Sequence, residues 1–156
     1  MTYTQSPPMT IQETESFLRE AKVARFCSLN RDGTIHAAPV WYKYENGEII
    51  VATPPTSRKA RNVRRNKNVT MLIDISEGGV RPKGVIVYGK AELTTNTMEI
   101  PEAVSLLEKY TPRDKAEAYA KGLFKLTKWV KMTVKPERMA SFDYNKDEAY
   151  QSAVEG

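Results

Sequence analysis

The segment Val51-Ala52-Thr53-Pro54-Pro55-Thr56-Ser57-Arg58-Lys59 predicts a strand, a turn and the start of a helix in immediate succession. The apolar run from Ile49 to Thr53 is typical of a buried strand. The two prolines end this strand, because proline has no N–H group to donate to a neighbouring strand. Ser57 is a favoured N-cap residue, so we expect a short helix from about Arg58 to Asn66.

This predicted helix carries the main concentration of charge in the sequence. The chain has 24 basic and 19 acidic residues, which gives a net charge of +5. Residues 58–67 contain no acidic residue and six basic ones: Arg58, Lys59, Arg61, Arg64, Arg65 and Lys67. The rest of the chain is therefore nearly neutral, which favours a local anion-binding site over a uniformly basic surface. A solvated basic helix face is the alternative explanation.

The start of this helix has the chemistry of a phosphate site. Arg58 and Lys59 fall in the first turn, where the helix dipole is positive and opposes each cation by roughly 0.3 to 1 kcal/mol. A bound phosphate would relieve this repulsion. It would accept hydrogen bonds from free N–H groups, the Ser57 hydroxyl, the Arg58 guanidinium and the Lys59 ammonium.

Signals on both sides of this segment indicate a mainly β protein. A capping-box pattern, Thr10 with Glu13, predicts an opening helix. Tight-turn pairs ending in Gly33 and Gly47 predict a three-stranded meander. The expected strands cover residues 24–30, 35–44, 49–53, 69–75, 84–93, 129–134 and 138–144, and two later helices cover 101–110 and 112–123. Six or seven strands with hairpin turns and flanking helices predict an α+β fold built on a small antiparallel barrel.

Length and composition bound the possible functions. A chain of 156 residues fits a single domain over residues 1–156, with a loosely ordered tail expected over 145–156. No apolar run is long enough to span a membrane and no signal peptide is evident, so we expect a cytoplasmic protein. The single cysteine, Cys27, excludes an internal disulfide, and with the single histidine, His36, it argues against a metal centre built on His and Cys, so no metal ligands are proposed.

Several of these segments together resemble a known family. The run Val51–Lys59 followed by Asn62 is similar to the strand, turn and Ser-Arg-Lys phosphate site of the pyridoxamine 5'-phosphate oxidase-like flavin-binding split-barrel superfamily. Further similar segments are Gly33–Tyr42, Arg61–Thr70, Val87–Leu93 and Val134–Phe142. The resemblance covers most of residues 14–144 and implies a six- to seven-stranded antiparallel split β-barrel.

The resemblance also implies a cofactor and an assembly. It implies a homodimer with one FMN in each of two clefts between the subunits. Ser57, Arg58 and Lys59 would hold the phosphate, and backbone groups of Val40 and Trp41 would face the flavin ring. The remaining cofactor-binding positions are Thr53 beside the ring or ribityl chain, Asn62 one helical turn beyond, and Trp129, which would close the cleft from the partner subunit.

The sequence departs from the oxidase that gives the family its name. That enzyme has an arginine and a lysine on the strand equivalent to Ala37–Tyr42, and this chain has neither. The C-terminal arginine and histidine pattern that holds pyridoxal phosphate is also missing. We therefore expect an FMN-dependent oxidoreductase acting on another small organic substrate, or a reductase of the same fold using an 8-hydroxy-5-deazaflavin. The ring would supply the hydride chemistry, so no side chain is assigned a catalytic role.

Two other functions fit the charge pattern. A nucleic-acid-binding barrel would use the basic helix on phosphodiesters and stack bases on exposed Trp41, Tyr42 and Tyr44. It explains less well why the cations follow a Pro-Pro turn and a capping serine. A split barrel that has lost its cofactor and only dimerises is the third possibility.

Overall fold

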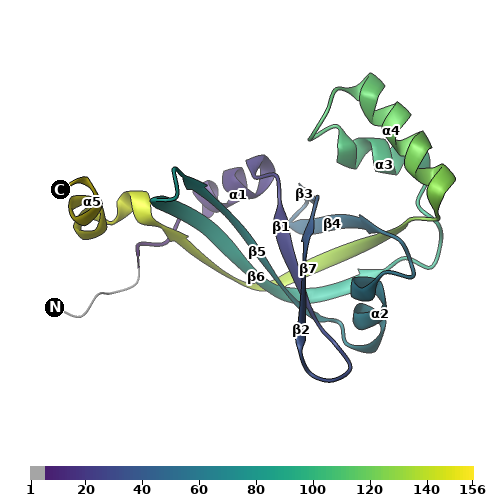
Figure 1. The fold of residues 1–156 in the computed structure, drawn as a ribbon, viewed down its shortest axis with the longest axis horizontal. Helices are drawn as coiled ribbons and strands as arrows, with labels where there is room; N and C mark the ends of the chain where they lie inside the picture. The colour runs from purple at the N-terminus through teal and green to yellow at the C-terminus, as the bar shows by residue number, and fades with distance from the viewer. Residues whose placement is uncertain (1–5) are drawn as a thin grey trace.

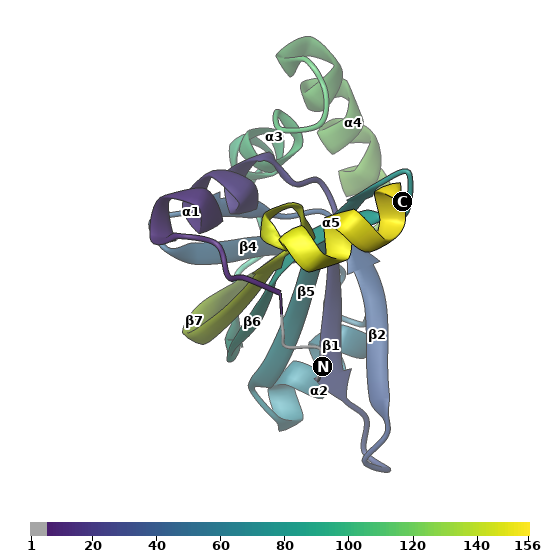
Figure 2. The same ribbon diagram turned by 90° about the vertical axis from the view of Figure 1, so that its left-hand side faces the viewer.

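The computed structural model describes residues 6–156 as one curled sheet with flanking helices. All seven strands are antiparallel, in the order β2-β1-β5-β6-β7-β4-β3, and they form a half-open barrel (Figure 1 and Figure 2). The strands are β1 (Ala24–Leu29), β2 (Ile35–Val40), β3 (Lys43–Glu45), β4 (Glu48–Thr53), β5 (Asn68–Glu77), β6 (Arg81–Leu93) and β7 (Val130–Asp143). The predicted α+β split barrel is confirmed.

The barrel interior is filled by apolar side chains from alternate strand positions. Phe26, Met71 and Ile73 are fully buried there. Helix α1 (Ile11–Glu20) adds Phe17 and Leu18 to the same core. The predicted capping box starts this helix, because the Glu13 N–H donates to Thr10 Oγ1 at 3.1 Å and the Thr10 N–H donates to the Glu13 carboxylate.

The prediction of a single strand over residues 35–44 is wrong, because the structure has two strands there, β2 and β3. Its first half, β2, pairs with β1, and its second half, β3, pairs with β4 at the opposite edge of the sheet. The break lies at Trp41 and Tyr42. There the Tyr42 N–H donates to the Tyr110 hydroxyl at 2.8 Å, and the Tyr42 hydroxyl donates to the Leu18 carbonyl at 2.6 Å. These bonds replace strand pairing, so the chain crosses from one sheet edge to the other.

The two strands predicted over 129–134 and 138–144 are instead one continuous strand, β7. Glu137, next to Pro136, has no partner in β6, so the register shifts between the pairs Tyr88–Arg138 and Gly89–Pro136. A bulge tolerates a proline because the proline needs no partner for an N–H group. Gly89 makes this bulge possible, since a Cβ there would overlap the carbonyl oxygen of Lys135.

Three helices lie outside the barrel around one of its ends. Helix α2 (Arg58–Arg65) buries Ala60 and Val63 and contacts β1 and β6. Helices α3 (Ile100–Leu107) and α4 (Arg113–Leu126) form a hairpin between β6 and β7, which stands off from the sheet in Figure 1. The hairpin has its own apolar cluster of Met98, Ala103, Val104, Leu107, Ala116 and Ala120.

The loosely ordered tail expected over residues 145–156 is instead structured. A 3-10 turn, η1 (Tyr144–Lys146), leads into helix α5 (Glu148–Glu155). Asp147 caps α5 by accepting the Tyr150 N–H at 2.9 Å, and the Tyr144 and Tyr150 rings meet edge to face with centroids 4.7 Å apart. The polar composition of this segment predicts a loosely ordered tail, whereas the Asp147 cap and the contact between Tyr144 and Tyr150 stabilise a helix.

We predict that Gly89→Ala lowers the free energy of unfolding by about 2 to 3 kcal/mol, because the added methyl group meets backbone that cannot move aside. Urea denaturation followed by circular dichroism measures the change. Gly122→Ala is the matched control, since Gly122 lies in α4 with no atom near an added Cβ. This control should be neutral or raise stability by up to about 1 kcal/mol, and equal effects of the two substitutions would contradict the bulge argument.

Candidate functional site

The predicted turn from β4 into α2 forms as expected around Ser57. The Ser57 N–H donates to the Pro54 carbonyl at 3.0 Å, and Ser57 Oγ accepts the Ala60 N–H at 3.2 Å as the N-cap. Thr53 Oγ1 lies 2.7 Å from Ser57 Oγ. When Thr53 donates this bond, both acceptor positions of Ser57 are filled and the Ser57 proton is left to donate to an anion. Thr53 is fully buried behind Ser57, so it positions the serine and does not itself line a hollow.

An apolar cavity of about 230 Å³ lies beside the start of α2. It is enclosed by the end of β2, by β4, by α2 and by the α3–α4 hairpin. Its lining residues are Pro39, Val40, Trp41, Ala52, Lys59, Met98, Ala103, Leu106, Leu107, Tyr119, Leu123, Phe124 and Trp129. Four of the predicted cofactor-binding residues therefore meet in one cavity: Val40, Trp41, Lys59 and Trp129.

Lys59 is the one charged side chain in this lining. Within residues 6–156 its ammonium has no hydrogen bond or ion pair, and burial lowers the pKa of Lys59 below the usual lysine value. Removing a cation from water without a counter-ion is unfavourable. An anion bound at the start of α2 would compensate for this cost.

Aromatic side chains form one wall of the cavity. Trp41 is 44% exposed and stacks on Tyr110, with ring centroids 4.5 Å apart and planes 11° apart. Tyr119 lies beyond it, at 6.1 Å from the Trp41 ring. Tyr110 and Tyr119 were not predicted as site residues, although the spacing of Tyr119 and Leu123 on one helix face was a usable signal.

Trp129 lies against the cavity of its own subunit, and its expected place in the partner's cleft stays a prediction. Its indole N–H donates to the Leu123 carbonyl of the same chain at 3.2 Å, and its ring packs against the hairpin cluster. Trp129 therefore lines the cavity of its own subunit.

Arg58 points to a different hollow from Lys59. We call this second site the arginine hollow; it has a volume of about 600 Å³ and is lined by Arg31, Arg58, Arg61, Asn62, Arg64 and Arg65. Adjacent residues of an α-helix point about 100° apart, so Arg58 and Lys59 leave the helix start on different faces. The start of α2 therefore lies between an apolar cavity and a basic hollow.

Asn62 fastens α2 to the sheet. Its amide nitrogen donates to Ser28 Oγ at 3.1 Å and to Asn30 Oδ1 at 3.0 Å, and its oxygen accepts from Arg65 at 3.1 Å. The residue is 1% exposed. Because both amide protons are used inside the protein, the Asn62 side chain supports α2, and the cofactor contact expected from the resemblance stays a prediction.

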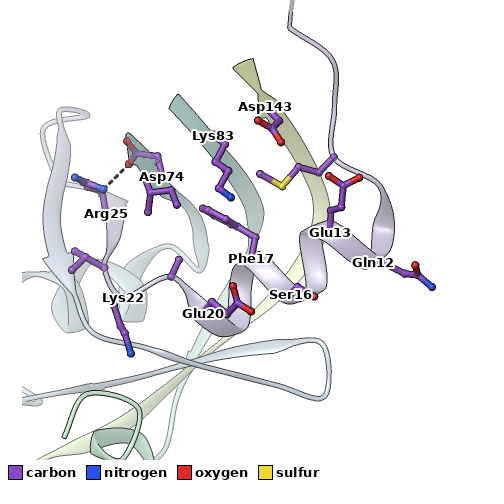
Figure 3. Close-up of a pocket in the computed structure, with 14 residues that line it drawn as sticks. Gln12, Glu13, Ser16, Phe17, Glu20, Lys22, Arg25, Asp74, Lys83 and Asp143 are labelled. Atoms are coloured by element: carbon purple, nitrogen blue, oxygen red, sulfur yellow. Dashed lines mark hydrogen bonds and ion pairs between the residues drawn. The ribbon is translucent and has the colours of Figure 1, made fainter. Parts of the chain in front are cut away.

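A third hollow of about 610 Å³ lies between α1 and the sheet (Figure 3). Its lining has four acidic and three basic residues, and ion pairs join Arg25 to Asp74 at 2.5 Å and Glu13 to Lys146 at 2.7 Å. Lys83 stands over the Phe17 ring at 5.9 Å. This balance of charges makes the hollow a weaker candidate for an anion than the start of α2.

The aromatic platform required for nucleic-acid stacking does not form. Tyr42 and Tyr44 are buried, and the Tyr44 hydroxyl donates to Glu15 at 2.7 Å. Burial and this carboxylate raise the pKa of Tyr44 to about 12. Of the three aromatic residues that this function needs, Trp41 alone is exposed, and its ring already stacks on Tyr110.

Two features that would bear on function are absent from residues 6–156. No helix there has the length and apolar character needed to cross a membrane. No three or more His, Cys, Asp or Glu side chains in the described region are grouped so as to hold a metal ion.

Comparisons with known proteins agree with this architecture. A conserved hypothetical protein from Mycobacterium tuberculosis is 26% identical, with a TM-score of 0.77 and 92% of both chains covered. An FAD-binding protein from Mesorhizobium loti is 19% identical, with a TM-score of 0.62 and coverage of 86% of this chain and 95% of that one. A protein described as an F420 reductase is 21% identical, with a TM-score of 0.58 and coverage of 80% and 94%.

A search of curated proteins gives no match. The family model described as pyridoxamine 5'-phosphate oxidase matches residues 10–136, which include the whole segment from the first helix to the middle of β7. Together with the split barrel and the serine-capped basic helix, this match shows that the chain belongs to the pyridoxamine 5'-phosphate oxidase-like family of split-barrel proteins.

Proposed function

We propose that this protein is a flavin-dependent oxidoreductase that binds FMN at the start of α2 and acts on a small organic substrate. The observation that carries the proposal is Lys59, a half-buried cation without a partner where an apolar cavity meets a helix N-terminus. A ligand made of an apolar ring and a phosphate would place its ring in the apolar cavity and its phosphate beside the Lys59 ammonium.

The residues at the start of α2 fit a phosphate group. Within the described chain, no acceptor is found for the backbone N–H groups of Arg58 and Lys59, which are the first two of the helix. The Ser57 hydroxyl and the Lys59 ammonium complete a set of donors around one helix start. Such a set is typical of phosphate sites at helix N-termini.

The cavity fits a planar apolar group. Its wall consists of Val40, Trp41 and residues of the α3–α4 hairpin. β2 is an edge strand, so alternate backbone N–H and C=O groups point away from β1 and are available to the polar edge of a ring. We infer that Trp41 orients the ring and that the hairpin excludes water from it.

A bound flavin would supply the hydride or electron transfer through its ring. The chain itself binds the phosphate, orients the ring and desolvates the cavity. A deazaflavin-dependent reductase is the alternative form of this proposal, and it is supported by the structural similarity to the F420 reductase. The nucleic-acid alternative is not retained, because the platform of Trp41, Tyr42 and Tyr44 does not form.

We further propose that the protein is a cytoplasmic homodimer. Leu29 and Ile35 are exposed on the outer face of the sheet, where they line a shallow hollow with Cys27, Val69 and Tyr88. Exposed apolar surface of this kind is characteristic of subunit contacts. The family resemblance supports the same assembly.

The absorption spectrum of the purified protein tests the cofactor. We expect a flavin or deazaflavin band, with the compound released by heat identified by mass spectrometry, or else uptake of added FMN.

Arg58→Ala with Lys59→Ala should weaken FMN binding by about 100-fold or more, because each charge-assisted hydrogen bond contributes about 1.5 to 3 kcal/mol. Arg19→Ala with Arg113→Ala removes two exposed cations elsewhere and should leave the affinity unchanged. Equal affinity of the site variant and the wild type would refute the phosphate site.

FMN affinity should fall as the pH rises through the alkaline range. Burial lowers the pKa of Lys59, so its ammonium loses its proton at a lower pH than free lysine, whose pKa is about 10.4. The FMN phosphate is already a dianion above about pH 7. The bound state therefore weakens as Lys59 becomes neutral. Titrations between about pH 7 and pH 10 should show this loss for the wild type but not for Lys59→Arg, nor for riboflavin, which has no phosphate. A flat profile for the wild type would rule out a binding role for the Lys59 charge.

Light scattering at micromolar concentration should give about twice the chain mass of 17.7 kDa. Leu29→Glu with Ile35→Glu should produce monomers, because two buried carboxylates oppose association. Leu126→Glu, at a position that is 81% exposed on the hairpin, should leave the mass unchanged. A wild-type protein of monomer mass would contradict the proposed assembly.

A further inference from the structure

Two lysine side chains meet where the α3–α4 hairpin joins the barrel. Lys109 lies in the turn between α3 and α4, and Lys22 lies in the link between α1 and β1. The Lys22 ammonium donates to the Lys109 carbonyl at 2.6 Å. Two cations from distant parts of the sequence are therefore brought to one junction.

The Lys109 ammonium rests on aromatic rings and has little polar contact. It stands over the Tyr42 ring, 3.6 Å from the ring centroid, and lies 5.8 Å from the centroid of the Tyr110 ring. Its one hydrogen bond within residues 6–156 is a long one, to the Tyr42 carbonyl at 3.4 Å. A ring face attracts a cation but cannot accept its proton. Lys109 has therefore given up part of its hydration without gaining a strong acceptor.

No carboxylate forms an ion pair with Lys109 in the part of the chain that the structure describes. Glu108, the residue before it, pairs with Arg113 at 3.2 Å. Glu45 of β3 pairs with Lys43 at 3.2 Å. The acids on the adjoining elements are therefore matched with other cations.

The charge that acts on Lys109 has its own sign. Glu20, at the end of α1, forms no ion pair with Lys109 or Lys22 in the described residues, so the Lys22 ammonium stays uncompensated. Burial and the charge of Lys22 both favour the neutral amine and lower the pKa of Lys109 to about 8. At about pH 7.5, roughly a quarter of Lys109 is then neutral, against about 0.1% of a free lysine.

A neutral product fits this junction better than the cation does. Conversion of the amine to an amide removes the charge, and with it the cost of burial and the repulsion by Lys22. The N–H of that amide can still point at the face of the Tyr42 ring. An anionic product would instead place a negative charge over a ring face that is itself negative. The surroundings of Lys109 therefore favour acylation over the addition of an acidic group.

We propose that Lys109 is a site of acylation by an activated acyl donor, either a thioester or an acyl phosphate. The lone pair of the neutral Lys109 Nζ forms a bond to the acyl carbon. The bond from that carbon to sulfur, or to the phosphate oxygen, breaks, and the thiolate or phosphate leaves with the electron pair. The nitrogen loses one proton to water, and no oxidant or reductant takes part. The inference does not depend on the proposed cofactor.

Lys59 is the competing lysine, because it is also half-buried without a partner in the described chain and burial lowers its pKa. The two lysines differ in place. Lys59 lines the apolar cavity at the proposed phosphate site, whereas Lys109 is not part of that lining. Added FMN should therefore protect Lys59 from a reagent and leave Lys109 exposed to it.

The experiment measures the acetylation rate of each lysine in the full-length protein. The probes are acetyl-CoA and acetyl phosphate, and mass spectrometry of the digested protein at low conversion gives the rates. At about pH 7.5, Lys109 should react at least about tenfold faster than Lys115, which is exposed on α4, because its larger neutral fraction outweighs its lower intrinsic nucleophilicity. Its rate should level off above about pH 9, whereas the rate of Lys115 should rise to about pH 10.

The variant Lys22→Gln should slow the acetylation of Lys109 at about pH 7.5 by about twofold or more, because the like charge that favours the neutral amine is gone. Lys22→Arg keeps that charge and should keep the rate. Lys90→Gln, at an exposed position on β6, is the charge-matched control and should also leave the rate unchanged.

Two results would overturn the inference. One is a Lys109 rate at about pH 7.5 that is equal to or below that of Lys115. The other is a Lys109 rate that rises in step with that of Lys115 up to about pH 10. An unchanged rate in Lys22→Gln would refute the part assigned to Lys22. Loss of FMN protection at Lys59, with Lys109 still reacting fastest, would contradict the proposed function and leave the acylation site standing.

Discussion

The hydrogen bonds of the buried Asn62 side chain hold α2 in the orientation on which the whole candidate site depends. They join the middle of the helix to Ser28 and Asn30 at the end of β1. Arg65 strengthens this attachment by donating to the Leu29 carbonyl at 2.5 Å. A rotation of the helix by one residue, about 100°, would move Lys59 out of the apolar cavity. The separation of an apolar side from a basic side therefore follows from a polar contact inside the protein.

The break between β2 and β3 has a comparable effect on the other side of the cavity. It leaves the Tyr42 N–H without a strand partner, and the Tyr110 hydroxyl accepts it while donating to the Lys22 carbonyl at 2.7 Å. The Lys109 ammonium lies 3.6 Å from the centre of the Tyr42 ring, where burial and the neighbouring Lys22 charge lower the pKa of Lys109 to about 8. One irregularity of the backbone thus opens the barrel and attaches the hairpin that covers the cavity.

The sequence predicts correctly those helices and strands whose first or last residues are determined by neighbouring residues in the chain. The Thr10 capping box, the two prolines after β4 and the Ser57 cap act within a few residues, so the sequence was sufficient for them. The division of residues 35–44 and the continuity of β7 depend on Tyr110 and Gly89, which are distant in sequence or lie on another strand. The site shows the same limit. Arg58 and Lys59 are predicted together at a phosphate, but the fact that they line two different hollows depends on how α2 packs against the sheet.

The charge at the helix starts distinguishes α2 from the other α-helices of residues 6–156. Each of those has an acidic residue in its first turn: Glu13 in α1, Glu102 in α3, Asp114 in α4 and Glu148 in α5. Helix α2 has Arg58 and Lys59 there, and cations at this end oppose the helix dipole. Arg64 and Arg65 in its last turn are favourable, so basic composition alone does not explain the arrangement. An arrangement that destabilises the free protein is consistent with binding, because an anion at the helix start offsets the repulsion and stabilises the folded state by a free energy that grows with the logarithm of its concentration over Kd.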